Sequence, residues 1–398
     1  MDRRAFIRAG TVGPVVGWSA LASRRGLAQE QAAATGAGQP AGPAAEPAPA
    51  RIVRQEVPQN LESPFHLLDG PITPVERFYV RNHFPVPRLD PAAYRLRIEG
   101  AVERPCELSL AELRQLPATT RTLTLECAGN GRVFLNPPVR GVQWGLGAVS
   151  TAEWTGVTLG SVLERVGVRP EAVAVVLEGA DRGVVAEPAS PGPISYARSL
   201  PLAKARRPEV LLAYRMNGAD LLPAHGFPLR AVVGGWYGMA SVKWLVRIVV
   251  VDRPFAGFWE TFDYSEFRLR DGLPEMVPIT GGQVKSAIAR PVMGEVVRGG
   301  AEYRIYGAAW AGEHDVVRVE VSTDNGASWH VARLLGERVP FAWRLWEWTW
   351  RVQRQAGEAR LLVRATDSAN RTQPRDRDPN YRTYSIHHLI PTVVTIRV

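Results

Sequence analysis

The sequence predicts an α+β protein with two folded regions, a mixed region of strands and short helices followed by a β-sandwich. Three observations carry this prediction: strand-like runs dominate, helical stretches are short, and the pattern changes at about residue 278. The connections are long and rich in Gly and Pro, and neither a dinucleotide fingerprint nor a P-loop occurs. These features argue against a doubly wound parallel sheet.

The N-terminus resembles an export signal. Arg3 and Arg4 form a twin arginine, a mildly apolar stretch covers 9–22, and Gly26-Leu27-Ala28 offers small residues for cleavage. We therefore expect residues 1–28 to be a twin-arginine signal peptide and the protein to be periplasmic, without a membrane span. The alternative is a frayed basic N-terminus. Residues 29–52, rich in Ala, Gly, Pro and Gln, are expected to form a disordered linker.

The charge is only modestly basic once the signal is set aside. The formal net charge is +9, of which residues 1–28 supply +4, leaving +5 for residues 29–398. No tract rich in Lys or Arg is present, so we expect no nucleic-acid partner and a mild preference for anionic ligands. Lysine is rare and occurs only at three positions, Lys204, Lys243 and Lys285.

Residues 53–277 are expected to form the first region. Two helices are predicted there from their ends: Ser109–Leu116, with Glu112 completing a capping box, and Thr158–Val166, with a Thr N-cap and Gly167 as its stop. The predicted strands are Tyr94–Ile98, Leu123–Leu125, Val173–Leu177, Leu229–Val233 and Val242–Asp252.

Residues 278–398 are expected to form one Ig-like β-sandwich. Alternating runs cover 302–306, 317–323, 344–352 and 360–366, and Asp324-Asn325-Gly326 is typical of a hairpin turn. Four Trp residues between 343 and 350 either line an interface with a second subunit or the first region, or fill the core; the pattern leaves both readings open.

Cys127 is the residue whose chemistry is most constrained. It follows the strand-like run 121–125, opens a Gly/Asn turn, and has Arg132 five residues further on. A nearby guanidinium favours the thiolate, the form that binds metals or attacks substrates. Cys106 is the one other cysteine, so a multi-cysteine metal cage is excluded. Cys127 is thus a single sulfur ligand, a nucleophile, or half of a disulfide with Cys106.

Further polar residues cluster at strand ends. Arg81-Asn82-His83 follows one strand-like run, Asp181 closes another, and His225 and Arg230 flank the entry to a third. A glycine-bearing loop then leads through Ser241 to Lys243. Each of these groups alone could belong to an ordinary loop without a binding role. Together they supply cations, hydrogen-bond donors and one carboxylate, as a phosphate-bearing heterocyclic cofactor would require.

Read in order, these segments resemble the sulfite oxidase family of molybdenum-cofactor oxidoreductases, of the bacterial exported type. The resemblance runs from about residue 60 to the C-terminus and implies a mixed α+β molybdopterin-binding domain followed by a dimerisation-type sandwich. The matching segments are Phe-Tyr-Val-Arg81-Asn82-His83, Leu-Glu-Cys127-Ala-Gly-Asn-Gly-Arg132, Gly-Ala-Asp181, Ser-Tyr196-Ala-Arg-Ser-Leu-Pro-Leu, His225-Gly-Phe-Pro-Leu-Arg230 and Val-Lys243-Trp.

The resemblance implies a role for each candidate residue. Cys127 would be the protein thiolate on molybdenum, beside the dithiolene sulfurs of molybdopterin. The residues implied to hold the pterin and its phosphate are Asn82, His83, Asp181, His225, Arg230, Ser241 and Lys243. Those implied to line the oxyanion pocket are Arg81, Arg132, Trp144, Tyr196 and Arg382, with Tyr196 hydrogen-bonded to the reacting oxygen.

The implied reaction is oxidation of sulfite to sulfate, with electrons passed to a separate acceptor such as a c-type cytochrome. No haem is expected in this chain, because no Cys-x-x-Cys-His motif occurs. Two departures reduce the expected positive charge near the site: Gly131 replaces the first of two arginines of the animal members, and Met239-Ala240-Ser241 replaces a more basic stretch. The alternatives are oxidation of sulfane sulfur, reduction of a sulfoxide, or a non-catalytic exported binding protein.

Overall fold

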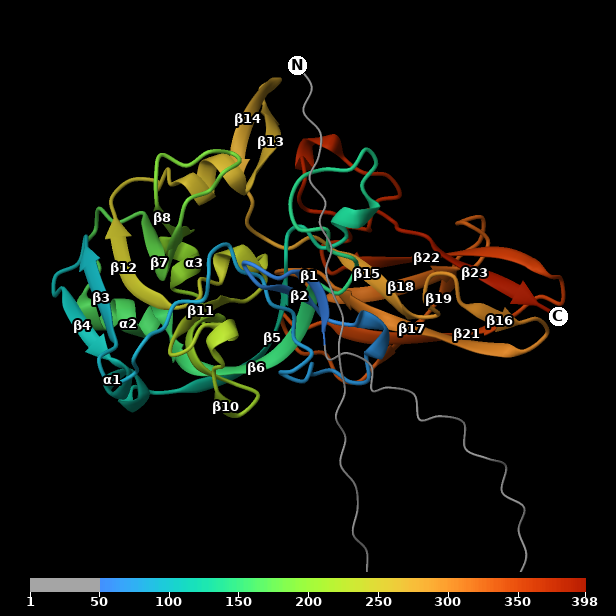
Figure 1. Cartoon of the computed structure of the whole chain (residues 1–398), viewed down its shortest axis with the longest axis horizontal. Coiled ribbons are helices and arrows are strands. Elements are labelled where there is room, and N and C mark those ends of the chain that lie inside the picture. Colours follow the sequence, from blue (N-terminus) through green and yellow to red (C-terminus); the bar gives the residue numbers. More distant parts are fainter. Residues whose placement is uncertain (1–50) are drawn as a thin grey trace, which may run out of the picture. The chain divides into compact units, whose positions relative to one another are not determined.

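The computed structural model describes residues 51–398, and two five-stranded sheets carry the first part of this range (Figure 1). The predicted signal peptide and most of the predicted linker lie outside the described residues. One sheet has the order β10-β9-β6-β5, with β11 also paired to β9, and is antiparallel throughout. Its strands are β5 (Thr119–Glu126), β6 (Val149–Thr158), β9 (Val210–Met216), β10 (Ala219–Asp220) and β11 (Arg230–Val233).

The second sheet has the order β4-β3-β12-β7-β8 and is mixed, because β3 and β12 run parallel while its other pairs are antiparallel. Its strands are β3 (Arg95–Gly100), β4 (Cys106–Ser109), β7 (Ala174–Gly183), β8 (Ile194–Pro201) and β12 (Leu245–Val251). Two antiparallel pairs stand apart from these sheets: β1 (Ile52–Gln55) with β2 (Asn60–Glu62), and β13 (Ser265–Arg270) with β14 (Leu273–Pro278).

Helices are few and short among the described residues. The capping box predicted at Ser109 is present, and α1 spans Leu110–Gln115. The Thr158 hydroxyl accepts a hydrogen bond from the Ser161 amide at the start of α2 (Leu159–Val166), and Gly167 ends that helix with a φ of 68°. The remaining helical turns are α3 (Leu202–Ala205), η1 (Phe65–Leu67), η2 (Arg132–Phe134), η3 (Pro223–His225), η4 (Gly238–Ala240), the π-helical η5 (Phe258–Asp263) and η6 (Pro379–Tyr381).

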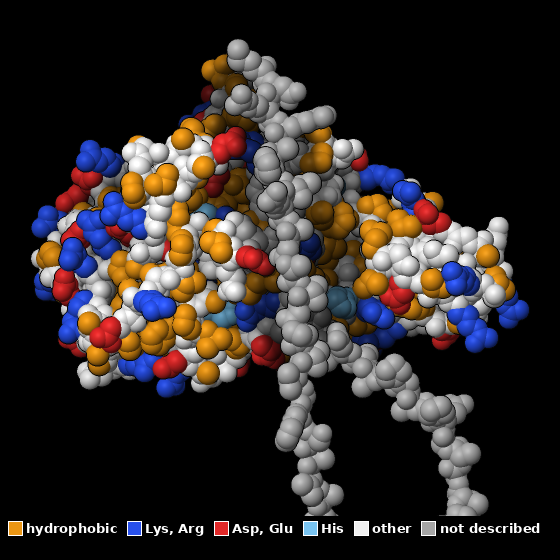
Figure 2. Space-filling view, in the orientation of Figure 1, with side chains coloured by type: hydrophobic (Ala, Val, Ile, Leu, Met, Phe, Trp, Pro, Cys, Tyr) orange, Lys and Arg blue, Asp and Glu red, His pale blue; other side chains and the backbone are white. Residues whose placement is uncertain are grey.

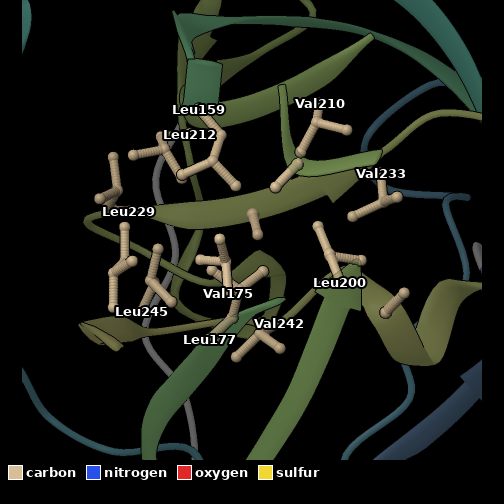
Figure 3. Close-up of a cluster of buried hydrophobic side chains, with 14 of the residues drawn as sticks. Leu159, Val175, Leu177, Leu200, Val210, Leu212, Leu229, Val233, Val242 and Leu245 are labelled. Carbon is tan, nitrogen blue, oxygen red and sulfur yellow. The ribbon is translucent and has the colours of Figure 1, made fainter. Parts of the chain in front are cut away.

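The core of the first region lies between these sheets and α2. Figure 3 shows side chains from α2, β7, β9, β11 and β12 meeting in one cluster. The predicted helical spacing is confirmed, because its apolar residues Leu159, Val162, Leu163 and Val166 are all buried. A second cluster, to which β5, β6 and β9 contribute, contains Cys127. The first sheet thus contributes to a packed core and to the candidate site.

Two further sheets enclose the core of a β-sandwich. The first has the order β15-β17-β21-β20 and consists of β15 (Lys285–Arg290), β17 (Glu302–Trp310), β20 (Arg333–Leu335) and β21 (Arg344–Arg351). The second has the order β16-β23-β22-β18-β19 and consists of β16 (Val296–Arg298), β18 (Val316–Ser322), β19 (His330–Val331), β22 (Gly357–Asp367) and β23 (Thr392–Arg397). The predicted hairpin is present, since β18 pairs with β19 across a turn in which Asn325 and Gly326 have positive φ.

The four tryptophans divide between the two uses that the sequence left open. Trp346 and Trp350 are buried in the sandwich core. Trp343 instead reaches the first region, where its indole nitrogen donates to the Pro71 carbonyl at 2.9 Å. Trp348 is partly buried and stacks on His330 with ring centroids 4.9 Å apart. Core filling and an interface with the first region therefore both occur within this chain.

Charged side chains are dispersed over the visible surface. In Figure 2 Lys and Arg are interspersed with carboxylates and apolar groups rather than gathered in one stripe. Within the described part of the chain, no helix combines the length and apolar character that a membrane crossing requires.

Candidate functional site

Cys127 is held at the buried end of β5. Its amide donates to the Ala148 carbonyl at 2.9 Å, and its own carbonyl accepts from the Asn130 amide at 2.8 Å, which closes the predicted Gly/Asn turn. The side chain is 7% exposed. Cys106 and Cys127 are both free thiols, so the disulfide alternative is not realised in this structure.

The thiol faces a cavity with an empty volume of about 660 Å³, open solvent included. Segments far apart in the sequence line it, because the ends of several strands and the loops after them converge there. Ten candidates from the sequence are among the lining residues: Arg81, Asn82, His83, Cys127, Asp181, Tyr196, His225, Arg230, Ser241 and Lys243.

Three cations, of which Arg230 is buried and Arg81 and Lys243 are partly buried, line this cavity without carboxylate hydrogen-bond partners among the described residues. Arg230 donates to the carbonyls of His225 and Ser241 at 3.0 and 3.1 Å, and Lys243 donates to the Asn82 side-chain oxygen and to the Ala224 carbonyl. Arg81 donates to the Asn82 carbonyl. Asp181 is the one carboxylate that the described residues contribute to the lining, so three cations face a single counter-charge, and the cavity is suited to an anionic ligand.

Burial perturbs the titration of the groups around these cations. It lowers the pKa of His225 to about 3, reinforced by Lys243 and Arg230, so the imidazole is neutral near pH 7. Burial likewise lowers the pKa of Lys243, with Arg230 acting in the same direction. It raises the pKa of Asp181 to about 6, against the opposing pull of Lys243. Strong shifts of this kind in one cavity are typical of functional sites.

Several polar atoms at the cavity are buried without a partner in residues 51–398. They are Asn82 Nδ2, Asp181 Oδ1 and His225 Nε2. Leaving such a group unpaired costs about 1–3 kcal/mol, so a ligand that pairs with all three atoms gains affinity from each. They offer a mixed set of hydrogen-bonding atoms, as a polar heterocycle requires.

A wider cleft of about 1930 Å³ opens beside the cavity and shares three of its lining residues, Arg81, Asn82 and His83. Arg382 also lines this cleft, and its guanidinium donates to the Ser265 hydroxyl at 2.7 Å. Arg81 therefore stands where the inner cavity meets the cleft, with a second arginine from the C-terminal part of the chain on the cleft wall.

Two family descriptions match the chain. "Oxidoreductase molybdopterin binding domain" matches residues 83–259, and "Mo-co oxidoreductase dimerisation domain" matches residues 277–388. The chain is 40% identical to the sulfite oxidase of Gallus gallus over 352 residues, which cover 82% of this chain and 73% of that protein. The chain belongs to the sulfite oxidase family of molybdenum-cofactor oxidoreductases.

Other members of the family and a solved structure agree with this assignment. Mitochondrial sulfite oxidase of Homo sapiens is 40% identical over 347 residues, covering 82% of this chain and 62% of that protein. The crystal structure of the sulfane dehydrogenase SoxCD from Paracoccus pantotrophus superimposes with a TM-score of 0.75 at 30% identity, covering 86% of this chain and 88% of that one. The resemblance to the sulfite oxidase family, the expected molybdopterin cofactor and the expected enzyme class are confirmed.

The cavity fits the molybdenum cofactor of this family. A single thiol faces it, as expected for a protein that adds one sulfur ligand to a metal already held by dithiolene sulfurs. The unpaired atoms of Asn82, Asp181 and His225 suit the edge of a pterin, and the cations Arg230 and Lys243 suit its phosphate. Ser241 also lines the cavity, and its hydroxyl accepts from the Val233 amide at 3.0 Å while keeping its own hydrogen to donate.

Two of the candidate residues from the sequence line neither the cavity nor the cleft. Arg132 is buried, and its guanidinium donates to the carbonyls of Val142 at 2.7 Å and Thr383 at 3.3 Å, beside the Tyr384 ring. Trp144 is fully buried in the hydrophobic cluster that contains Cys127. The structure thus places Arg132 and Trp144 around the Cys127 turn rather than on the wall of the cavity or the cleft.

The structure adds a residue that sequence reasoning missed. Tyr264 lines the cavity, and its hydroxyl oxygen lies 2.6 Å from His83 Nε2. Tyr196, the tyrosine singled out from the sequence, also lines the cavity, but its hydroxyl donates to the Met239 carbonyl at 2.8 Å while its ring stacks on His83. Tyr264 follows the π-helical turn η5 in a stretch without regular hydrophobic periodicity, so no pattern marked it.

Proposed function

We propose that this chain oxidises sulfite to sulfate at the molybdenum cofactor. The observation that carries the proposal is Arg81, a cation shared by the thiol-lined cavity and the open cleft that also contains Arg382. A small oxyanion entering through the cleft passes between fixed guanidiniums, which neutralise its charge and orient it. The identity to sulfite oxidases supports the choice of substrate.

The chain's own residues account for binding and orientation. When bound, the molybdenum cofactor supplies the redox chemistry, in which sulfite gains an oxygen atom derived from water and releases two electrons and two protons. Arg81 and Arg382 hold the oxyanion. Tyr264 places a phenolic O–H in the cavity, where the neutral imidazole of His83 fixes its position. Burial of the cavity excludes bulk water and strengthens these interactions.

The electrons are proposed to leave to a separate acceptor, a c-type cytochrome. Residues 278–398 are proposed to form an Ig-like dimerisation domain, after a molybdopterin-binding domain of residues 53–277; the match of residues 277–388 to a dimerisation domain supports a homodimer. The twin arginine at Arg3-Arg4 supports export to the periplasm.

A second candidate is oxidation of sulfane sulfur. It is favoured by the superposition on the sulfane dehydrogenase SoxCD over 86% of this chain. The volume of the cleft, about 1930 Å³ with the open solvent included, leaves room for a substrate larger than sulfite. We put sulfite first because the chain is 40% identical to the sulfite oxidase of Gallus gallus over 352 residues. Sulfoxide reduction, also raised by the sequence, has no comparable support.

Steady-state assays separate these candidates. The holoprotein is mixed with oxidised cytochrome c and either sulfite, thiosulfate or a protein-bound sulfane, and cytochrome reduction is followed by absorbance. Sulfite-dependent reduction that disappears in Arg81→Ala supports the proposal. If sulfite is inert while a sulfane drives cytochrome reduction, the second candidate replaces the first; if methionine sulfoxide accepts electrons from the reduced protein instead, both oxidation candidates are wrong.

A further inference from the structure

A buried ion pair joins the Cys127 turn to the sandwich. Glu126, the residue before Cys127, is 5% exposed, and Lys285, the first residue of β15, is 2% exposed. Lys285 Nζ lies 3.0 Å from Glu126 Oε1. A buried pair of this kind gives little net stability but is strongly disrupted when one partner is removed, because the other charge is left uncompensated.

Lys285 hydrogen-bonds to the turn on both sides of Cys127. Besides Glu126, its ammonium donates to the Asn130 carbonyl at 2.8 Å. The Asn130 amide nitrogen Nδ2 in turn donates to Glu126 Oε1 at 3.0 Å, and its oxygen accepts from the Ala148 amide. One ammonium therefore holds both Glu126, the residue before Cys127, and Asn130, three residues after it.

A second group of the sandwich completes the arrangement. Trp310 Nε1 donates to Glu126 Oε2 at 2.7 Å. Trp310 and Lys285 are paired across β15 and β17, so the two donors are held side by side by one sheet register. Both oxygens of the Glu126 carboxylate therefore receive a donor from the sandwich.

Gly131 lies next to this ammonium. A Cβ built at Gly131 would lie 3.7 Å from Lys285 Nζ and 3.2 Å from Ile386. This is the position at which the sequence departs from the arginine of animal members, and the departure led us to expect less positive charge near the site. The structure places the Lys285 ammonium of β15 beside this position, where its pairing with Glu126 leaves no uncompensated charge.

We propose that Lys285 is a positioning residue for Cys127, through which the sandwich sets the placement of the metal-binding thiolate. The proposal rests on the assignment of Cys127 as the molybdenum ligand. Small displacements of a reacting group cost up to about a hundredfold in rate, so loosening this turn is expected to reach the metal centre as well as lower stability.

The chain offers a matched control. Lys204 is also a buried lysine that joins the first region to the sandwich, with Nζ 2.9 Å from Glu209 and 2.7 Å from Glu313. It is not among the residues that line the cavity. Lys285→Met and Lys204→Met therefore remove comparable buried cations, of which Lys285 alone contacts the Cys127 turn.

The test compares these variants as holoproteins by molybdenum content, thermal unfolding and the EPR spectrum of the Mo(V) state, with turnover expressed per molybdenum. Both should unfold at a lower temperature. Lys285→Met should shift the Mo(V) g-values and lower kcat per molybdenum by at least about tenfold, with KM for sulfite within about threefold. Lys204→Met should leave the spectrum and kcat per molybdenum unchanged.

If Lys285→Met keeps the parental EPR spectrum and kcat per molybdenum while losing stability as Lys204→Met does, Lys285 is a structural bridge and the proposal is wrong. If Lys285→Met does not fold, Trp310→Phe removes one donor to Glu126, and Trp343→Phe, which removes the bond to Pro71, is its control. If the parental protein carries molybdenum but does not oxidise sulfite, only the proposed substrate is wrong. The EPR comparison of the variants still decides the role of Lys285.

Discussion

His83 Nε2 and the Tyr264 hydroxyl oxygen lie 2.6 Å apart, although 181 residues separate them in the sequence. Burial, together with the charges of Arg81 and Lys243, lowers the pKa of His83 well below its ordinary value, so the imidazole is neutral near pH 7. A neutral imidazole that carries its hydrogen on Nε2 donates to the phenolic oxygen and leaves the phenolic O–H free to donate into the cavity. This pair fixes a hydroxyl at the cavity wall, close to the place where the cleft begins.

Tyr264→Phe should therefore lower turnover more than Tyr196→Phe. The first change removes the hydroxyl paired with His83, whereas the second removes one already committed to the Met239 carbonyl. A positioned proton donor typically contributes about a hundredfold or more, so we expect kcat to fall at least about tenfold in Tyr264→Phe. Single-turnover reduction by sulfite measures the effect. A larger loss in Tyr196→Phe would favour the tyrosine singled out from the sequence.

Arg382→Met should weaken substrate binding. Loss of a guanidinium at the cleft removes a charge-assisted contact with an oxyanion, and we expect KM for sulfite to rise about tenfold or more. Arg140 is a suitable control, because it lines the same cleft but is paired with Glu187 at 2.5 Å.

Arg140→Met should change KM by less than about twofold. Steady-state kinetics at two salt concentrations check both variants, and the parental KM should rise with salt because charges draw the anion in. Equal KM values for Arg382→Met and the parent would show that Arg382 does not bind the substrate.

The cofactor-free protein should lose stability on acidification partly because of His225. Its pKa falls from the ordinary 6.5 to about 3 in the folded chain. The unfolded chain thus takes up a proton first, so the stabilising contribution is present above pH 6.5 and is lost as the pH falls toward 3. Between about pH 7.5 and about pH 5 this amounts to about 2 kcal/mol.

His225→Gln should lose correspondingly less stability over the same range, measured by urea unfolding of the cofactor-free proteins. Asp181 acts in the opposite direction, because burial raises its pKa to about 6 and protonation then favours the folded chain. The difference between parent and variant isolates His225. Identical pH profiles for the two proteins would show that His225 is not buried as described.

Local rules predicted the elements whose ends are set by nearby residues. The capping box at Ser109 and the Gly167 stop define α1 and α2 through contacts within a few residues, so the sequence alone located both helices. The turn that presents Cys127 was likewise predicted, since glycine and asparagine mark it directly.

Contacts that depend on how distant segments pack were not predicted. Lys285 lies next to Gly131 because β15 packs against the Cys127 turn, and no local sequence pattern reveals that packing. Arg132 was expected to line the pocket, yet carbonyls of Val142 and Thr383 take up its donors. Tyr264 was missed for the same reason, because only the folded chain brings it to His83.

The central claim is that the Cys127 thiolate binds molybdenum in the cavity. X-ray absorption at the molybdenum K-edge measures this directly, because the extended fine structure distinguishes sulfur from oxygen ligands. The parent should show one more sulfur ligand than Cys127→Ser at equal molybdenum loading. The same number of sulfur ligands in parent and variant would contradict the account, whatever the two proteins oxidise.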